Sequence, residues 1–293
     1  MSRVDVVIVA YNSRDHVRAA VEPLLSLEGV NVIVVDNASP DDSVAAVSDL
    51  PVSVIRNAEN LGFAKACNIG WRSGSAQRVL FLNPDAQMDG ESLERLLQAL
   101  DNRRAGLAAP RTVSSSGALV HSQRSFVGPG SIWAQTFYFH RLFPHASWVD
   151  GIVRDATAYE RPSTPDWVSG ACMLVDRSVL EQLGGFDERF FMYCEDMDLC
   201  KRIQGLGREI VYEPSARAIH DEGSSAPSST MVPVLVSSRL SYTEKYFHGW
   251  RRVASRTGIA AYEASRAIFS RGGGGARRSH LRGLRAAFGN GRP

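Results

Sequence analysis

Polar side chains in this sequence stand where predicted strands end. Asp36 and Asn37 follow the apolar run VIVV, and Asn83 and Asp85 follow VLFL. In open α/β sheets, ligands bind beyond the carboxyl ends of the strands. There Asp36 could accept hydrogen bonds from a base or a ribose, while Asp85 offers the hard oxygen that Mg²⁺ or Mn²⁺ prefers. These carboxylates suggest a site for a nucleoside diphosphate, although Asp and Asn also stabilise turns and cap helices.

A second acidic group opens a predicted helix at CEDMDLCKR, where Glu195, Asp196 and Asp198 stand in the first turn. The helix dipole alone would favour acids at such a place. It explains less well why two adjacent acids follow so closely after FFMY. The apolar stripe that would anchor this helix on a core consists of Leu199, Ile203 and Leu206. We therefore expect Asp196 to face a cleft.

The elements that would position these side chains alternate between strands and helices. Short β-branched runs predict strands at Val4–Ala10, Val30–Asp36, Val52–Arg56 and Val79–Asn83. Apolar spacing predicts helices around Arg14–Leu27, Pro40–Ser48, Phe63–Arg72 and Gly90–Asn102. Ser39 is the expected N-cap of the second of these helices. The alternation is typical of an α/β fold whose mostly parallel central sheet is covered on both faces.

The second half of the chain is less regular. Gly106–Pro165 contains an aromatic run and predicts an irregular, partly mobile surface that could cover a site. Order returns with a strand in WVSGACMLVDR and a helix that ends near Gly205. A strand pair at Glu209–Tyr212 and Ala216–His220 is expected to close the sheet. Residues after Ser229 look helical and pass through a flexible RGGGGARR to a basic end.

Composition excludes several classes of protein. The 293 residues carry a formal net charge of +2. Four cysteines without a CxxC pair or metal-finger spacing fit a reducing cytoplasm better than a secreted disulfide framework. Asp5 and Asn12 interrupt the first apolar run, so we expect no signal peptide, and no stretch approaches the roughly 18 apolar residues of a membrane span. We expect a cytoplasmic protein that meets a membrane, if at all, on its inner face.

The basic C-terminal tail is the expected membrane contact. From Arg251 onward, arginines outnumber the single acid Glu263. The arginines that follow Arg251 in this tail include Arg252, Arg256, Arg266, Arg271, Arg277, Arg278, Arg282 and Arg285. Leu281, Leu284 and Phe288 fall at helical spacing on one face. Such a helix could anchor on anionic lipid, and a solvated basic helix is the alternative.

Seven blocks of the sequence, taken in order, carry a resemblance to a known family. They are VAYN, VVDNAS, NAENLGFAKACNIG, FLNPDAQM, WVSGACMLVDR, FDERFFMYCEDMDLCKR and AIHDEGSS. Between about Val4 and Ser225 the chain resembles the inverting family 2 glycosyltransferases with the GT-A fold, and within them the rhamnosyltransferase branch. The resemblance implies a nucleotide-binding, Rossmann-like half at 1–105, an acceptor-binding half at 106–228 and a helical, basic extension at 229–293.

The resemblance also assigns a metal site and a donor pocket. NPDA stands in place of the family's DxD motif, so Asp85 is the implied metal ligand, and His220 in AIHDEGSS is the second. Asn83 departs from the motif, because an amide replaces the first carboxylate and metal binding must depend more on Asp85 and the diphosphate. Mn²⁺ or Mg²⁺ is the implied cofactor, and imidazole suits Mn²⁺ better. The implied nucleotide-sugar pocket consists of Tyr11, Asn12, Asp36, Asn37, Arg56, Asn60, Gly62, Asn68 and Asn83.

Acceptor and catalytic residues follow from the same resemblance. In the family's ED pair, Asp196 would deprotonate the acceptor hydroxyl and Glu195 would hydrogen-bond the acceptor sugar. Trp167 stands where the family often contacts the acceptor, and its ring could pack on a pyranose or simply in the core. Arg124 could reach the donor's phosphates, or be solvated as an exposed loop arginine.

The predicted activity is metal-dependent, inverting transfer of L-rhamnose from dTDP-L-rhamnose to a saccharide. A polyprenyl-diphosphate-linked GlcNAc of cell-wall or surface-polysaccharide assembly is the expected acceptor. Transfer of galactofuranose, GlcNAc or another hexose from a UDP donor, and a non-catalytic sugar-binding protein, remain alternatives. A nucleotidyltransferase or a Rossmann dehydrogenase would open with a glycine-rich loop, which AYNSRDHV lacks. No nucleic-acid partner is expected, because aromatic and basic residues are not interleaved along a recognisable module.

Overall fold

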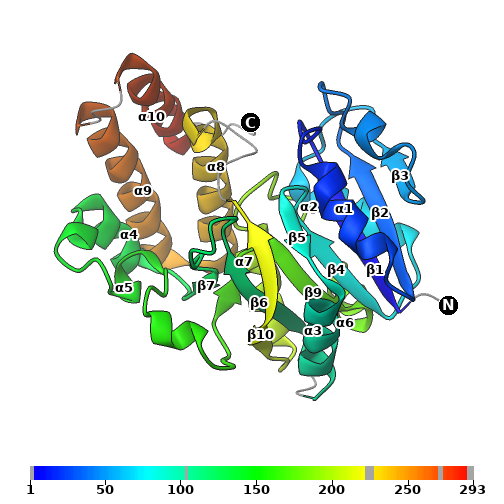
Figure 1. The fold of residues 1–293 in the computed structure, drawn as a ribbon. Coiled ribbons are helices and arrows are strands. Elements are labelled where there is room, and N and C mark those ends of the chain that lie inside the picture. Colours follow the sequence, from blue (N-terminus) through cyan, green and yellow to red (C-terminus); the bar gives the residue numbers. More distant parts are fainter. Residues whose placement is uncertain (1–2, 103–104, 222–227, 270–272, 289–293) are drawn as a thin grey trace. The chain divides into compact units, whose positions relative to one another are not determined.

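The chain forms two compact units. The computed structural model describes residues 3–102, 105–221, 228–269 and 273–288, whose elements are labelled in Figure 1. Unit 1 consists of Met1–Gln123, Asp155–Glu188 and Glu195–Ser225. Unit 2 consists of Arg124–Arg154, Arg189–Cys194 and Ala226–Pro293. Unit 2 thus takes two internal segments besides the predicted C-terminal extension, and the division differs from the predicted halves at 1–105 and 106–228.

An eight-stranded sheet forms the centre of unit 1 in the described part of the chain, in the order β3-β2-β1-β4-β9-β6-β10-β5. Its strands are β1 (Val4–Ala10), β2 (Val30–Asp36), β3 (Ser53–Arg56), β4 (Arg78–Leu82), β5 (Ala86–Met88), β6 (Leu107–Val113), β9 (Cys172–Asp176) and β10 (Ile210–His220). β1 runs parallel to β2 and β4, β2 to β3, and β6 to β10. β9 is antiparallel to β4 and β6, and β5 to β10. The mixed but mostly parallel sheet confirms the predicted α/β class.

Both faces of this sheet are covered, which explains why its central strands β1, β4 and β9 are mostly apolar. Successive side chains of a strand point to opposite faces. In β1, Val6 and Ile8 belong to one core cluster, and Val7 and Val9 belong to the other. Helices α1 (Val17–Leu25) and α3 (Gly90–Asn102) contribute to the first cluster. Helices α2 (Phe63–Ser73), α6 (Arg177–Leu183) and α7 (Glu195–Gly205) contribute to the second.

Helix α2 lies unusually close to the sheet, and a glycine makes this possible. A Cβ atom at Gly70 would lie 2.4 Å from Cγ1 of Val7 and 3.1 Å from Cγ2 of Val35. Any larger residue would therefore push the helix away from β1 and β2. This close packing fixes the N-terminus of α2 at the edge of the sheet where β1 and β2 end.

Strands β1 and β2 and helix α3 match their predicted bounds, but β6 was missed. Leu107–Val113 lies inside the stretch that the sequence indicated to be irregular. Its alanines and Pro110 have low β-propensity. The proline is tolerated because β9 pairs only with Leu107 and Ala108, so no ladder hydrogen bond from residue 110 is lost on that side.

The predicted strand pair after Glu209 is wrong, because it is one strand. β10 runs unbroken over Ile210–His220 and pairs with β6, with a shift of register between Glu213 and Arg217. The intervening residues form a bulge, which bends a strand without ending it. β10 also does not close the sheet, since β5 pairs with its last residues.

The predicted helix over Pro40–Ser48 is a short 3₁₀ helix, η1 (Ser43–Val47), preceded by Asp42 in the left-handed region at φ 56°. Ser39 is not its N-cap. The Ser39 hydroxyl instead donates to the Ala10 carbonyl at 3.2 Å and so links the ends of β1 and β2. The smaller elements of unit 1 are β8 (Trp167–Val168) and η3 (Ala156–Tyr159), and β7 (Gln123–Arg124) contains a boundary between the units.

Unit 2 is helical in its described part. Its elements are α4 (Pro129–Thr136), η2 (Phe139–Arg141), α5 (Ser147–Asp150), α8 (Ser228–Tyr246), α9 (Gly249–Phe269) and α10 (Gly273–Phe288). A small core of Ile132, Val236, Leu240, Ile259 and Ala287 joins four of these helices. Among the described residues, no helix combines the length and the hydropathy that a bilayer-spanning segment requires.

The predicted apolar face of the tail is divided between the core and the surface of unit 2. Leu284 packs towards the core of unit 2, whereas Leu281 and Phe288 are exposed by 43% and 78%. Ala287 takes the buried position instead. The predicted flexible stretch RGGGGARR begins in residues 271–272, which lie outside the described part, and its remainder from Gly273 on is helical. Removing α10 would uncover the core of this unit.

Candidate active site

The carboxyl ends of four neighbouring parallel strands lie at one edge of the unit 1 sheet. Tyr11 follows β1, Asp36 and Arg56 end β2 and β3, and the turn with Asn83 and Asp85 follows β4. Two non-glycine residues at this edge, Asn12 and Ala38, have left-handed φ angles of 53° and 60°. Such conformations are costly and concentrate at functional sites. The edge therefore has both the chemistry and the backbone geometry of a candidate site.

Asp85 and His220 meet at this edge. The peptide N–H of Ala86 donates to the Asn83 carbonyl at 3.0 Å, which closes a turn with Pro84 and Asp85 at its centre. β5 follows at once, and its Ala86 pairs with His220 of β10. The His220 Nε2 atom lies 3.2 Å from Asp85 Oδ1, and the two side chains are only 12% and 5% exposed. Two residues 135 positions apart are thus brought together by the sheet.

This pair fits a divalent cation. A carboxylate oxygen and an imidazole nitrogen, both shielded from water, are a hard and a borderline donor that together suit Mn²⁺. Within the described ranges, no group of three His, Cys, Asp or Glu side chains forms a metal cluster. A bound diphosphate or water is the expected source of further ligands. The sequence block AIHDEGSS continues beyond Asp221 into residues outside the described part.

Asp196 lies beside the same turn. Its Oδ2 atom accepts a hydrogen bond from the peptide N–H of Gly170 at 3.0 Å. The next residue, Ala171, accepts a hydrogen bond through its carbonyl from the peptide N–H of Asn83 at 2.9 Å. Two successive residues before β9 therefore connect Asp196 to the turn that carries Asp85.

Glu195 differs sharply from its neighbour. It is only 6% exposed, and its Oε2 atom is buried without a hydrogen-bond partner. Burial, followed by the nearby charges of Asp196 and Asp198, raises the pKa of Glu195 well above its usual range. The same carboxyl group contributes, after burial, to the raised pKa of Cys67 on α2. Burial therefore favours the protonated form of Glu195, and a direct contact with an acceptor sugar would require it to become exposed.

The raised pKa of Glu195 predicts a pH dependence of stability. The folded chain keeps a proton on Glu195 at pH values where the unfolded chain, with a carboxyl pKa near 4.5, has lost it. Stability should therefore fall as the pH rises from that value towards the folded-state pKa. In Glu195→Gln the free energy of unfolding should lose this slope, which is at most about 1.4 kcal/mol per pH unit. Urea unfolding at pH 5 to 8 measures it.

The exposed Glu181 on α6 supplies the control for this experiment. Glu181→Gln removes a carboxylate of the same size that folding does not bury, so its pH profile should stay parallel to that of the wild type. Parallel profiles for Glu195→Gln as well would show that Glu195 is ionised in the folded chain.

The predicted donor-pocket residues fall into two groups. Tyr11, Asn12 and Arg56 are exposed at the edge, and Asp36 is half-buried there. Asn37 is 2% exposed, and all of its hydrogen-bonding capacity is used within the chain. Its amide donates to Asn60 and Gly62, and its oxygen accepts from Asn57 and Leu61. Asn37 thus holds the loop before α2 in shape, and Gly62 in that loop has φ 82°.

Asn68 lies in the middle of α2 and is 1% exposed. Its amide donates to the Phe186 carbonyl and to Glu188, while its oxygen accepts from Trp71 Nε1 and the Phe186 peptide N–H. Three of these hydrogen bonds fasten α2 to the loop after α6, and the fourth, from Trp71, lies within α2. A residue with that role shapes unit 1 without offering a polar atom to a ligand.

Trp167 and Arg124 are the remaining predicted contacts. Trp167 is partly buried and packs against the core cluster that includes α7, which agrees with the core alternative. Arg124 belongs to unit 2, where it forms an isolated β-bridge with Ile152. Its charge contributes to the lowered pKa of Asp150.

Sequence reasoning missed Gly170 and Asp221. The Asp221 carboxylate accepts hydrogen bonds from the peptide N–H and hydroxyl of Ser115, at 2.9 and 3.1 Å, which hold the pKa of that carboxyl below its usual value. Asp221 directly follows His220, so these hydrogen bonds connect the end of β10 to the loop after β6. The signal was present in the sequence as a second acid directly after the candidate ligand.

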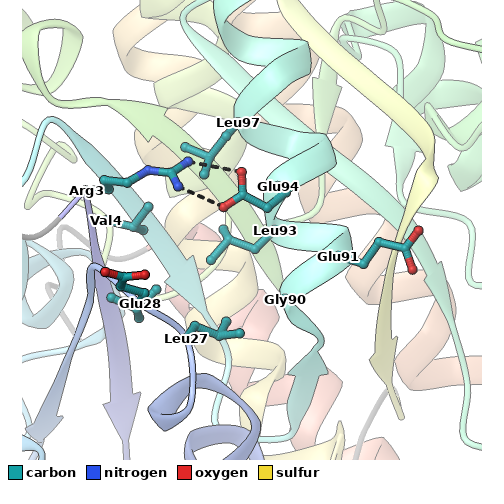
Figure 2. Close-up of a pocket in the computed structure, with 10 residues that line it drawn as sticks. Arg3, Val4, Leu27, Glu28, Gly90, Glu91, Leu93, Glu94 and Leu97 are labelled. Carbon is teal, nitrogen blue, oxygen red and sulfur yellow. Dashed lines mark hydrogen bonds and ion pairs between the residues drawn. The ribbon is translucent and has the colours of Figure 1, made fainter.

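A cavity of about 330 Å³ lies at the opposite edge of the sheet (Figure 2). Arg3 and Val4 at the start of β1, Leu27, and Gly90 and Glu94 of α3 are among its lining residues. The Arg3 guanidinium donates two hydrogen bonds to Glu94 at 3.0 and 3.1 Å, as Figure 2 shows. None of the predicted site residues lines this cavity. The cavity is therefore separate from the candidate site.

Comparison with known proteins gives a consistent result. The sequence model described as "Glycosyl transferase family 2" matches residues 5–184. The chain is 32% identical, over 84% of its length and 86% of the relative's, to "N-acetylglucosaminyl-diphospho-decaprenol L-rhamnosyltransferase" of Mycobacterium tuberculosis. It is 29% identical to "Rhamnosyltransferase WbbL" of Escherichia coli, over 51% of this chain and 54% of that protein.

Solved structures show the same fold. The mannosyltransferase PcManGT from Pyrobaculum calidifontis, in complex with GDP-Man and Mn²⁺, superimposes with a TM-score of 0.55 at 17% identity, covering 99% of this chain and 76% of that one. GalNAc-T7 with UDP, GalNAc and Mn²⁺ gives a TM-score of 0.57 at 14% identity, covering 88% and 54%. At these identities the similarity concerns the fold alone.

Proposed function

The chain belongs to glycosyl transferase family 2, and we propose that it moves L-rhamnose from dTDP-L-rhamnose to a polyprenyl-diphosphate-linked GlcNAc, with inversion at the anomeric carbon. It is a glycosyltransferase with the GT-A fold. The donor sugar and the acceptor are supported by the similarity to the mycobacterial rhamnosyltransferase over most of both chains. The observation that carries the proposed chemistry is that Asp85 and His220 meet at one edge of the sheet, while Asp196 is connected to the same turn through Gly170 and Ala171.

Asp196 is the proposed general base. One of its oxygens accepts a hydrogen bond from the Gly170 peptide N–H, which fixes the direction of the carboxyl group. An acceptor hydroxyl that gives its proton to this carboxylate would attack the anomeric carbon on the face opposite the leaving diphosphate. A single displacement of this kind inverts the configuration. Burial favours the protonated form of the neighbouring Glu195, which in that form does not compete for the proton.

Asp85 and His220 are the residues proposed to hold a divalent cation. When bound, such an ion acts as a Lewis acid towards the negative charge of the departing diphosphate. We propose Mn²⁺ over Mg²⁺ because one ligand is an imidazole. The half-buried Asp36 and the exposed Tyr11 are the proposed contacts to the nucleoside.

Thermal unfolding with a panel of nucleotide sugars tests the donor. At 100 times its dissociation constant, a ligand of the folded state alone stabilises by about 2.7 kcal/mol. We expect dTDP-L-rhamnose with Mn²⁺ to raise the melting temperature most, and Asp85→Ala to remove the part of the rise that needs Mn²⁺. The exposed Glu91 on α3 provides the control, because Glu91→Ala removes a surface carboxylate outside the turn. A rise that is the same with and without Mn²⁺ would contradict the metal site.

Transfer of another sugar from a UDP donor is the second candidate. Thymine and uracil differ by one methyl group, which is worth only about 1 kcal/mol in an apolar contact. A larger shift with a UDP-sugar than with dTDP-L-rhamnose would favour this candidate and leave the general base and metal ligands unchanged.

A further inference from the structure

Unit 2 exposes a compact group of apolar side chains that its own fold does not cover. Five large side chains are exposed in the stretch that runs from the end of α4 into α5. They are Phe137 at 63%, Phe139 at 37%, Leu142 at 72%, Phe143 at 49% and Trp148 at 53%. We refer to residues 137–148 as the aromatic segment. Exposed apolar groups that occur singly are ordinary, but a contiguous set of this size marks an interaction surface.

The rings of the aromatic segment contact one another. Phe139 lies with its ring centroid 6.3 Å from Phe137, 6.5 Å from Phe143 and 6.4 Å from Trp148. Phe143 and Trp148 are 5.8 Å apart. Because each ring is held by its neighbours, the segment presents one apolar surface of fixed shape, and binding to it would cost little side-chain entropy.

The segment is also fastened to the rest of unit 2. The Trp133 indole N–H donates to the Ala254 carbonyl of α9 at 2.9 Å. The Thr136 hydroxyl donates to the Gly258 carbonyl at 3.1 Å, and the Tyr138 and Ser265 hydroxyls lie 3.1 Å apart. Figure 1 shows α4 beside α9. Polar groups of α4 and of Tyr138 thus form hydrogen bonds with α9, while the large apolar side chains of the segment remain exposed to solvent.

Charge indicates what this surface meets. Residues 137–148 contain no acid, and they carry Arg141 together with two histidines. The Arg141 guanidinium lies 4.8 Å from the Tyr138 ring centroid. Burial and the charges of Arg266 and Arg141 lower the pKa of His140, so the segment is cationic through Arg141 at neutral pH. The first acid after it, Asp150, is already paired with Arg154 at 2.6 Å.

We propose that the aromatic segment inserts into the interfacial region of a bilayer that contains anionic lipid. Phe, Leu and Trp side chains next to cations, without an intervening acid, are the composition that binds at the boundary between headgroups and acyl chains. The surface differs from the basic tail, whose described arginines lie on α9 and α10. It goes beyond the proposed transfer reaction, because vesicle binding is measured without donor or acceptor. A second copy of the chain is the competing occupant.

Vesicle co-sedimentation tests the proposal. We expect the intact protein to bind vesicles of phosphatidylcholine and phosphatidylglycerol, and Leu142→Glu/Phe143→Glu to weaken the apparent affinity about tenfold or more. The control is Trp250→Glu/Val253→Glu, which adds the same charge to α9 of the same unit at side chains that are 74% and 61% exposed. This control should stay within about twofold of the wild type, because its two side chains lie outside the aromatic segment. The added charge is the same in both variants, so repulsion from anionic lipid alone would weaken both equally.

Three outcomes would overturn the proposal. The first is unchanged vesicle binding in Leu142→Glu/Phe143→Glu, and the second is an equal loss in the control. The third is concentration-dependent dimerisation in sedimentation velocity that the double variant abolishes while vesicles bind neither protein. Lipids brominated along the acyl chain add a structural readout, because bromine quenches the fluorescence of a tryptophan that enters the acyl region. If Trp148 inserts, Trp148→Phe should remove most of this quenching. Arg277→Glu/Arg278→Glu measures the contribution of the tail separately.

Discussion

Asp196→Asn should lower kcat by about 10² to 10⁴ while leaving the dissociation constant of the donor nearly unchanged. The factor is the usual contribution of general-base catalysis. The amide keeps the size of the side chain and can still accept the hydrogen bond from Gly170, so the loop before β9 should stay in place. What it loses is the ability to take the acceptor's proton. Initial rates with saturating acceptor, together with donor calorimetry in the presence of Mn²⁺, measure the two quantities.

Two further variants make this result specific. Glu195→Gln should keep kcat at neutral pH within a few-fold, because burial already favours the protonated form of the carboxyl group that it replaces. Glu181→Gln, on the exposed side of α6, should have no effect. If Asp196→Asn kept full activity and Glu195→Gln lost it, the base would be Glu195 and the order of the two roles would be reversed.

The sequence could predict those parts of the site that follow directly from the strand ends. In parallel strands, all carboxyl ends meet at one edge, so Asp36 and Asp85 were expected to share it. The meeting of Asp85 with His220 depends on a short antiparallel strand, β5, that no pattern indicated. Three residues are too few for an alternating pattern to be read. Here the resemblance to a family supplied what periodicity could not.

For two buried amides, the resemblance predicted a ligand contact where the structure shows hydrogen bonds within the chain. Asn37 and Asn68 stand in the motifs that carry the resemblance, and both were expected to contact the donor. Each uses its four hydrogen-bonding positions inside the chain. A sequence motif records that an amide is needed but not whether its partner is a ligand or a loop. Only the geometry of the surrounding backbone distinguishes the two.

Asp5 was read in the sequence only as an interruption of an apolar run, yet it is 0% exposed in β1. Its Oδ2 accepts hydrogen bonds from an Arg177 guanidinium N–H at 2.7 Å and from the Ala76 peptide N–H at 2.8 Å. Its Oδ1 accepts from the Asn31 amide at 2.9 Å. Arg177 also donates to the Trp71 carbonyl at 2.9 Å. One buried ion pair therefore ties together β1, β2 and the ends of α2 and β9.

We expect Asp5→Ala to lower the free energy of unfolding by about 3 to 5 kcal/mol, because it leaves the Arg177 charge buried without its counter-ion. Urea unfolding followed by circular dichroism measures the loss. Glu94→Ala is the matched control, since it breaks the Arg3 ion pair, whose side chains are 56% and 51% exposed, and should cost about 1 kcal/mol or less. Equal losses in the two variants would show that the Asp5 pair is no stronger than a surface pair.

The position of Asp5 also separates stability from catalysis. It stands near the start of β1, whereas Tyr11 follows the other end of that strand at the candidate site. The variant should therefore lower the fraction of folded enzyme and leave kcat per folded molecule unchanged. Asp5→Leu/Arg177→Met removes both charges, so it should recover much of the lost stability, because an apolar pair needs no counter-ion. A double variant as unstable as Asp5→Ala would assign the loss to the Asn31 and Ala76 hydrogen bonds instead.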